Sequence, residues 1–217
     1  MRTFDDAVRA FLREHPRGDN GRAHWLCVEL PQTARARRAL LPDEERRRTT
    51  AQSAPDLSWR DEVDPAQRVL VTAQGLLMYL RPAEVRRLIA GCAEAFPGGA
   101  LVFDAVPRWF GERTRRGRMK TAQGHVAPPM PWRPDAGELP KIRTAHPAVT
   151  EVRELPLPRG RGAYFGVVWP VLRRLPGARN IPPAMTVLAR FGPTARIARR
   201  ALSVERPLRT VKRRGRR

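Results

Sequence analysis

Cysteine and lysine are scarce in this chain, and a long hydrophobic run is missing. The chain of 217 residues has two cysteines and four histidines far apart in the sequence, so neither a disulfide framework nor a zinc site is expected. We interpret Cys27 and Cys92 as core residues. No apolar run approaches the ~20 residues that span a bilayer, and the opening MRTFDDAVRAFL lacks the apolar centre of a signal peptide. We therefore expect a cytoplasmic protein with no metal site and no membrane span.

The shortage of lysine contrasts with a strongly basic chain. Only three of the 42 cationic residues are lysine, and the formal net charge is +21. Residues 171–217 hold fourteen of these cations and one acid, Glu205, and so supply +13 of the total. We accordingly divide the chain into an α/β domain over residues 1–170 and a basic, partly disordered extension over residues 171–217.

Two apolar runs of strand length flank a helical pattern in the middle of the chain. RVLVTAQGLLMYL covers residues 68–80 and GALVFDAV covers residues 99–106. Between them, Val85, Leu88, Ile89, Cys92 and Phe96 recur at helical spacing. This order predicts a βαβ unit and a parallel sheet. Ligands of such sheets bind beyond the carboxyl ends of the strands, where Gln74, Gly75 and Asp104 are expected.

The remaining segments extend this α/β pattern on both sides. We predict helices over residues 4–15, 31–41, 137–145 and 184–191, strands over residues 25–30 and 49–53, and an antiparallel hairpin of residues 149–155 and 163–168. Residues 107–134 are rich in Arg, Gly and Pro and are expected to form a long loop above the carboxyl edge of the sheet.

Four successive blocks carry a family resemblance. They are HWLCVELPQ with a basic helix and LLP, then SAPDLSWRDEV, VLVTAQGLLMYL and FPGGALVFDAV. In order and spacing they resemble the S-adenosylmethionine-dependent O-methyltransferases of the leucine carboxyl methyltransferase class, above all the tetracenomycin-type polyketide branch. The resemblance runs from Trp25 to Val106 and more weakly to Trp169. It implies a Rossmann-like α/β sheet, mostly parallel with a C-terminal antiparallel hairpin, S-adenosylmethionine as methyl donor and a small-molecule acceptor.

The resemblance also implies roles for individual residues. Glu29 matches the acid that accepts hydrogen bonds from the two ribose hydroxyls, and a carboxylate has the two acceptor oxygens for that task. Asp56 and Leu57 match the pair that holds the adenine, and Gln74 matches a polar residue that faces the cofactor. Taken singly, each residue also has a structural interpretation: Glu29 as an acid that starts a helix, Asp56 as a loop residue and Gln74 as a cap of a strand end.

One expected block is missing. Members of the family carry a glycine-rich E/D-x-G-x-G motif after the first strand, and it wraps the methionine half of the cofactor. Here the corresponding interval is RGDNGRAH, residues 17–24, which holds neither the motif nor an apolar strand. Gly160-Arg161-Gly162 is the nearest glycine pattern, but it lies in a predicted hairpin turn with no helix after it. We therefore predict a sheet without its first strand, whose neighbours expose their edges.

If the chain is active, the cofactor supplies the methyl group, and the acceptor decides whether the chain must supply a base. A carboxylate acceptor needs no base at neutral pH, whereas a phenol profits from one, and His125 in the long loop is the candidate. Two other functions are consistent with the sequence. The chain can be an inactive, methyltransferase-like binding module, or it can bind nucleic acid through its basic tail. The tail lacks interleaved aromatic residues and any recognition motif, so we expect no nucleic-acid partner.

Overall fold

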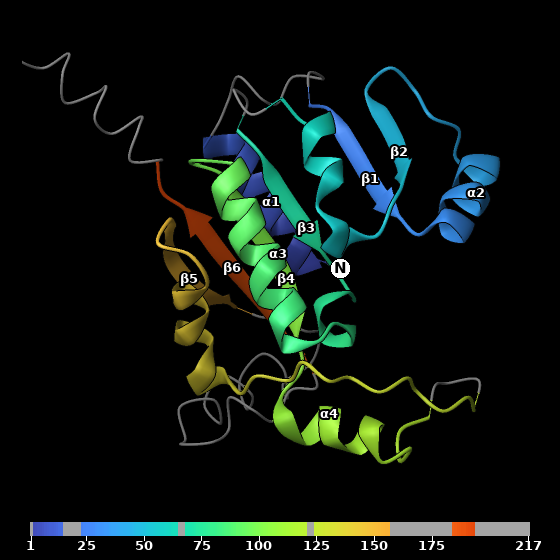
Figure 1. The fold of residues 1–217 in the computed structure, drawn as a ribbon, viewed down its shortest axis with the longest axis vertical. Coiled ribbons are helices and arrows are strands. Elements are labelled where there is room, and N and C mark those ends of the chain that lie inside the picture. Colours follow the sequence, from blue (N-terminus) through green and yellow to red (C-terminus); the bar gives the residue numbers. More distant parts are fainter. Residues whose placement is uncertain (1, 15–22, 65–67, 121–123, 157–183, 194–217) are drawn as a thin grey trace, which may run out of the picture.

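A computed structural model describes residues 2–14, 23–64, 68–120, 124–156 and 184–193, which form two sheets with helices around them (Figure 1). The larger sheet has the strand order β3-β4-β6-β5, and the smaller one pairs β1 with β2. The strands are β1 (Trp25–Glu29), β2 (Arg47–Ala51), β3 (Leu70–Ala73), β4 (Ala100–Ala105), β5 (Val149–Leu155) and β6 (Met185–Phe191). The α-helices are α1 (Arg2–Glu14), α2 (Pro31–Leu40), α3 (Pro82–Ala95) and α4 (Arg108–Arg115). The 3-10 helices are η1 (Ala54–Asp56), η2 (Ser58–Glu62), η3 (Leu77–Tyr79) and η4 (Ala136–Ala145).

The predicted βαβ unit is confirmed. Strands β3 and β4 pair in parallel, with Leu70 opposite Ala100, and α3 connects them. The helix begins at Pro82, whose fixed φ suits a first turn, and Glu84 accepts a hydrogen bond from the Arg81 backbone N–H at 2.8 Å. Local sequence signals therefore set the start of this helix.

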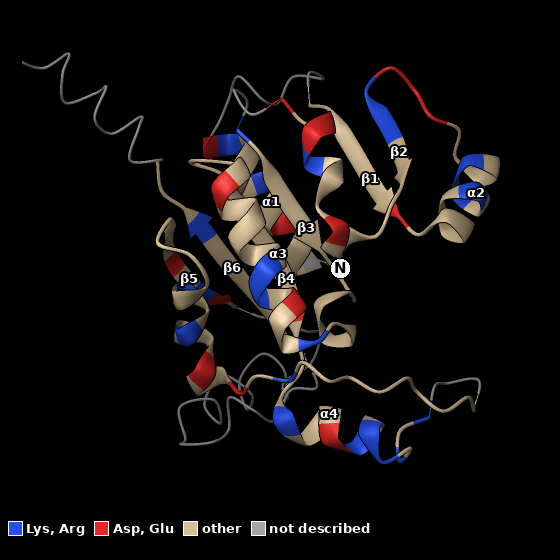
Figure 2. Ribbon diagram, in the orientation of Figure 1, with Lys and Arg blue, Asp and Glu red and all other residues tan. Residues whose placement is uncertain are grey.

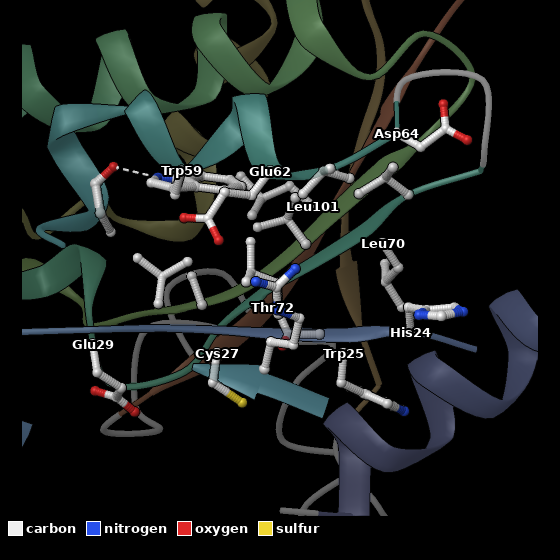
Figure 3. Close-up of a pocket in the computed structure, with 18 of the residues that line it drawn as sticks. His24, Trp25, Cys27, Glu29, Trp59, Glu62, Asp64, Leu70, Thr72 and Leu101 are labelled. Carbon is white, nitrogen blue, oxygen red and sulfur yellow. Dashed lines mark hydrogen bonds between the residues drawn. The ribbon is translucent and has the colours of Figure 1, made fainter. Parts of the chain in front are cut away.

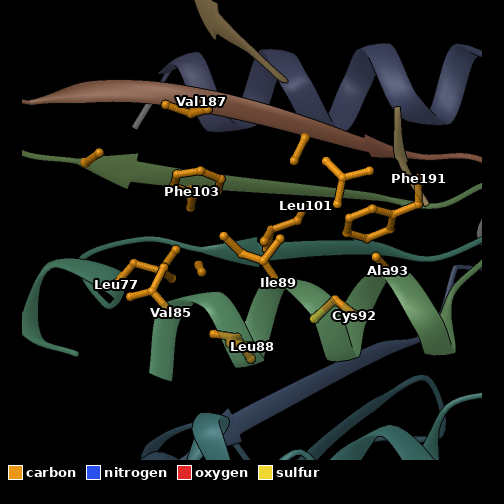
Figure 4. Close-up of a cluster of buried hydrophobic side chains, with 14 of the residues drawn as sticks. Leu77, Val85, Leu88, Ile89, Cys92, Ala93, Leu101, Phe103, Val187 and Phe191 are labelled. Atoms are coloured by element: carbon orange, nitrogen blue, oxygen red, sulfur yellow. The ribbon is translucent and has the colours of Figure 1, made fainter. Parts of the chain in front are cut away.

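The larger sheet buries both of its faces. On β4, Leu101 and Phe103 point towards α3 and pack with Ile89 and other buried residues of that helix (Figure 4). The alternate residues Ala100 and Val102 pack against α1 instead. The near-continuous apolar sequence of β4 follows from this position between two helices.

The smaller sheet repeats the strand-helix-strand order. Strands β1 and β2 pair in parallel, with Trp25 opposite Arg47, and α2 connects them. Its helix is rich in arginine, as is α4 (Figure 2). The second strand was predicted at residues 49–53 and lies two residues earlier, at Arg47–Ala51, where Thr49 and Thr50 are its buried members.

The C-terminal part of the sheet corrects one prediction. Residues 184–191 were predicted as a short helix, but Met185–Phe191 forms β6. It lies between β4 and β5 and pairs antiparallel with both, so burial between two neighbours outweighs the helical propensity of its Met, Ala and Leu residues. The hairpin partner predicted for β5, residues 163–168, lies outside the described residues. The range 171–217, assigned from the sequence to a basic extension, thus contributes a central strand.

A second correction concerns the segment after β4. It was predicted as a loop over residues 107–134, but Arg108–Arg115 forms the helix α4, which starts directly after Pro107. This helix lies beyond the carboxyl ends of the strands (Figure 1). Among the described helices, none has the length and apolar character needed to cross a membrane.

Candidate functional site

The carboxyl ends of β1, β2, β3 and β4 all face the same edge of the molecule (Figure 1). Each strand is followed at this edge by a polar or acidic residue that the sequence had singled out. Glu29 ends β1, Asp56 follows β2, Gln74 follows β3 and Asp104 is near the end of β4. This edge is therefore the candidate site.

Glu29 lies at the mouth of a cavity of about 530 Å³ between β1 and β3 (Figure 3). Its side chain is half-buried, and Ala54, Ala73 and Leu76 also line the cavity. A half-buried carboxylate at a strand end keeps both oxygens available for donors of a ligand. This placement is consistent with the role that the resemblance implied.

Asp56 and Leu57 form a tight turn after β2. Leu57 has φ +69°, in the left-handed region, and only 8% of its side chain is exposed. Arg60 fixes this turn because its guanidinium donates to the carbonyl oxygens of Leu57 and Gly91, each at 2.9 Å. Asp56 is exposed, and one of its oxygens accepts from the Ser58 N–H at 3.4 Å. The turn thus buries the apolar member of the pair and presents the acid outwards.

Gln74, Gly75 and Asp104 meet at the ends of β3 and β4. The Gly75 N–H donates to Oδ1 of Asp104 at 2.8 Å, and Gly75 has φ +64°, a conformation that glycine adopts without strain. Burial raises the pKa of Asp104, and the hydrogen bond from Gly75 opposes that effect. The sequence placed these residues at one edge but gave no sign of the hydrogen bond between them. Asp104 therefore holds the turn that presents the exposed Gln74.

His125 is not part of this group of strand ends. It is exposed and lies after α4, next to the backbone bridge between Lys120 and Val126. Figure 1 shows this segment extending away from the sheet edge.

Comparisons with known proteins in sequence and in structure both find methyltransferases. No family model matches the chain. In sequence it is 32% identical over 101 residues to the tetracenomycin polyketide synthesis O-methyltransferase of Streptomyces glaucescens, across 46% of this chain and 36% of that protein. In structure it is similar to a putative methyltransferase from Thermobifida fusca, with a TM-score of 0.51, 17% identity, and coverage of 80% of this chain and 65% of that one.

Over 101 residues, then, the chain is similar in sequence to a tetracenomycin-type O-methyltransferase. It spans little more than a third of the length of the curated relative that it matches. The structural likeness to the Thermobifida protein supports the methyltransferase fold expected from the four sequence blocks.

Most of the interval in which the first strand was expected, residues 17–22, lies outside the described residues. Of the strands that the structure describes, none lies between β1 and β3, and the two sheets stay separate. The cavity next to Glu29 occupies this position and is lined by both strands along their length. The sequence predicted exposed strand edges here, but it did not predict that they would face each other across a defined cavity.

The two cysteines differ in their surroundings. Cys92 is fully buried, as predicted, and desolvation raises the pKa of its thiol to about 12. Cys27 is only half-buried, because it lines the cavity from β1. Among the residues that the structure describes, no three His, Cys, Asp or Glu side chains are grouped as metal ligands.

Proposed function

We propose that this chain is an S-adenosylmethionine-dependent O-methyltransferase that acts on a small molecule, and that Glu29, Asp56, Leu57 and Gln74 bind the cofactor. One observation carries the proposal: these residues follow successive parallel strands and reach the same edge. That edge is where ligands of parallel sheets bind.

The side chains at this edge fit the adenosine half of the cofactor. The two oxygens of Glu29 suit a vicinal diol, and the exposed carboxylate of Asp56 suits an exocyclic amine. The Leu57 side chain is buried in the core, so Leu57 would contact the ring mainly through its backbone, in the turn that Arg60 fixes. When bound, the cofactor supplies the electrophilic methyl group, so the chain itself has to orient donor and acceptor and exclude water.

The acceptor that this arrangement suits is a carboxylate or a phenolic hydroxyl. A carboxylate reacts in its ordinary ionised state, while a phenol needs its proton removed. We propose His125 as the base in the second case, and its position after α4 requires the segment to approach the edge when an acceptor binds.

Calorimetric titration with S-adenosylmethionine and S-adenosylhomocysteine tests the proposal. We expect binding that weakens roughly tenfold to a hundredfold in Glu29→Gln, because hydrogen bonds to a charged group contribute about 1.5–3 kcal/mol. Glu94→Gln is the matched control, since Glu94 is exposed on α3, away from the edge, and its replacement should leave the affinity unchanged. If the folded wild-type chain binds neither compound, the proposal is wrong.

A second function is favoured by the gap between the sheets. Contacts to the methionine half of the cofactor would have to come from the region between β1 and β3, which no described strand fills. A methyltransferase-like binding module without activity fits that observation. It predicts weak or absent cofactor binding by a chain that is otherwise folded, so the same titration separates the two functions.

A further inference from the structure

The cavity between the two sheets is bounded by two strand edges. Strand β1 is paired with β2 on one side, and β3 is paired with β4 on one side. Their other edges border the cavity, and both strands run in the same direction (Figure 1). In the described part of the chain, neither edge has a strand partner.

The printed hydrogen bonds show which backbone groups point into the cavity. The Trp25 N–H donates to Arg46 O at 2.7 Å, so the backbone groups of Trp25, Cys27 and Glu29 face β2. Because the hydrogen-bonding direction alternates along a strand, the groups of Leu26 and Val28 point the other way, into the cavity.

The same reasoning applies to the opposite wall. Val69 O accepts from the Ala100 N–H at 3.0 Å, so the groups of Val69, Val71 and Ala73 face β4. Those of Leu70 and Thr72 point into the cavity. The cavity therefore has a row of backbone donors and acceptors on each of two facing walls, the kind of edge with which an extended backbone pairs.

The floor of the cavity is apolar. Trp59, Leu88 and Leu101 border it, and Figure 3 shows Trp59 and Leu101 on the same side of the strands. Trp59 is held in place because its Nε1–H donates to Ala54 O at 2.9 Å. An occupant with apolar side chains at alternate positions would pack on this floor.

Charge distinguishes the two ends of the cavity. His24, Arg46 and Arg68 lie just before β1, β2 and β3, and Asp64 lies near them. With two arginines against one carboxylate, this end favours an acidic flank on the occupant. Glu62 lies towards the opposite end of the cavity, on the side of Glu29 (Figure 3), and favours a basic flank there.

We propose that the cavity is a docking site for one extended peptide segment of a partner protein. The segment lies between β1 and β3 and parallel to both, has apolar residues at alternate positions, an acidic N-terminal flank and a basic C-terminal flank. It joins the two sheets into one by strand addition. Neither S-adenosylmethionine nor methyl transfer enters this proposal, so it stands or falls independently of the proposed function.

A synthetic peptide tests the proposal on the full chain. The probe is a blocked peptide of about ten residues, a strand length with short flanks, with two N-terminal glutamates, alternating valine and threonine, and two C-terminal lysines. Hydrogen exchange followed by NMR should show at least about tenfold slower exchange at the amides of Leu26, Val28, Leu70 and Thr72. The amides of Cys27 and Val71, which already face β2 and β4, serve as internal controls and should not change.

Three control peptides sharpen the result. A peptide with the reversed sequence has the same composition but the opposite polarity, and it should bind at least about tenfold more weakly. A peptide N-methylated at two central valines loses two donors and should also bind about tenfold more weakly or worse, whereas N-methylation of a flanking glutamate should have little effect.

Other outcomes overturn the proposal. Absence of protection at the four cavity-facing amides would show that the peptide does not add as a strand. Equal binding of the forward and reversed peptides would overturn the parallel orientation and the charge argument. Protection of the same amides that rises with protein concentration without any peptide would show that a second copy of the chain is the occupant.

Discussion

At the scale of single residues, Asp104 is the side chain whose environment has the clearest consequence. It lies on β4 beneath the turn after β3, and burial there penalises its charged form. Because its pKa in the folded chain is raised above the ordinary value of 3.8, the folded state binds its proton more readily than the unfolded state does. The stability that this group contributes is present below pH 3.8 and is lost as the pH rises through the raised folded pKa.

Replacing Asp104 by asparagine should remove this pH dependence. Asparagine keeps a carbonyl oxygen that can accept from the Gly75 N–H, but it carries no charge to desolvate. We expect Asp104→Asn to be at least as stable as the wild type at neutral pH, and the difference between the two to shrink towards pH 3.8. Urea unfolding between about pH 3.5 and pH 7, an interval that includes the ordinary pKa of Asp, measures this difference. A large loss of stability at neutral pH would mean that Gly75 requires the charged carboxylate.

At the scale of elements, the connection between α3 and β4 depends on close backbone packing. A Cβ atom on Gly99 would lie 2.6 Å from Val69 O and 3.0 Å from Phe96 O, and neither is the end of a flexible side chain. We expect Gly99→Ala to destabilise the chain by about 1–3 kcal/mol, because backbone has to shift to admit the methyl group.

Gly137 provides the matched control for this substitution. It is exposed in η4, and a Cβ atom there would meet nothing within 4 Å. Gly137→Ala should change the free energy of unfolding by no more than about 0.5 kcal/mol in thermal or urea unfolding. Equal effects of the two substitutions would contradict the packing argument.

Elements were predictable where their signals were local. The residues of α3 repeat at helical spacing and start with a proline, and β3 and β4 are apolar runs of strand length, so sequence patterns alone located the βαβ unit. β6 was missed because its strand state comes from pairing with β4 and β5, both distant in sequence. The placement of Gln74 and Asp104 at one edge followed from parallel topology, whereas the Gly75–Asp104 hydrogen bond depends on the exact turn geometry.

At the scale of the whole molecule, the described chain consists of two units, the β1–β2 sheet and the four-stranded sheet, joined mainly through η1, η2 and α3. Arg60 of η2 donates to Gly91 O of α3. The ring centroids of Trp59 and Phe96 lie 6.0 Å apart. Glu29 belongs to the β1–β2 unit, while Gln74 and Asp104 belong to the larger sheet. The candidate cofactor site is thus divided between units whose facing strand edges are unpaired in the described structure.

This division predicts that strand addition and cofactor binding are coupled. A peptide docked between β1 and β3 fixes Glu29 relative to Gln74, so S-adenosylmethionine should bind more tightly to the peptide-saturated chain, by about 5–150-fold, the usual range of coupling free energies. Linkage requires that S-adenosylmethionine raise the peptide affinity by the same factor. Two calorimetric titrations, of each ligand with and without the other, measure both factors, and the reversed peptide is the control. If both ligands bind but neither changes the affinity of the other, the two units already hold Glu29 and Gln74 in the binding geometry, and the peptide joins the sheets without completing the cofactor site.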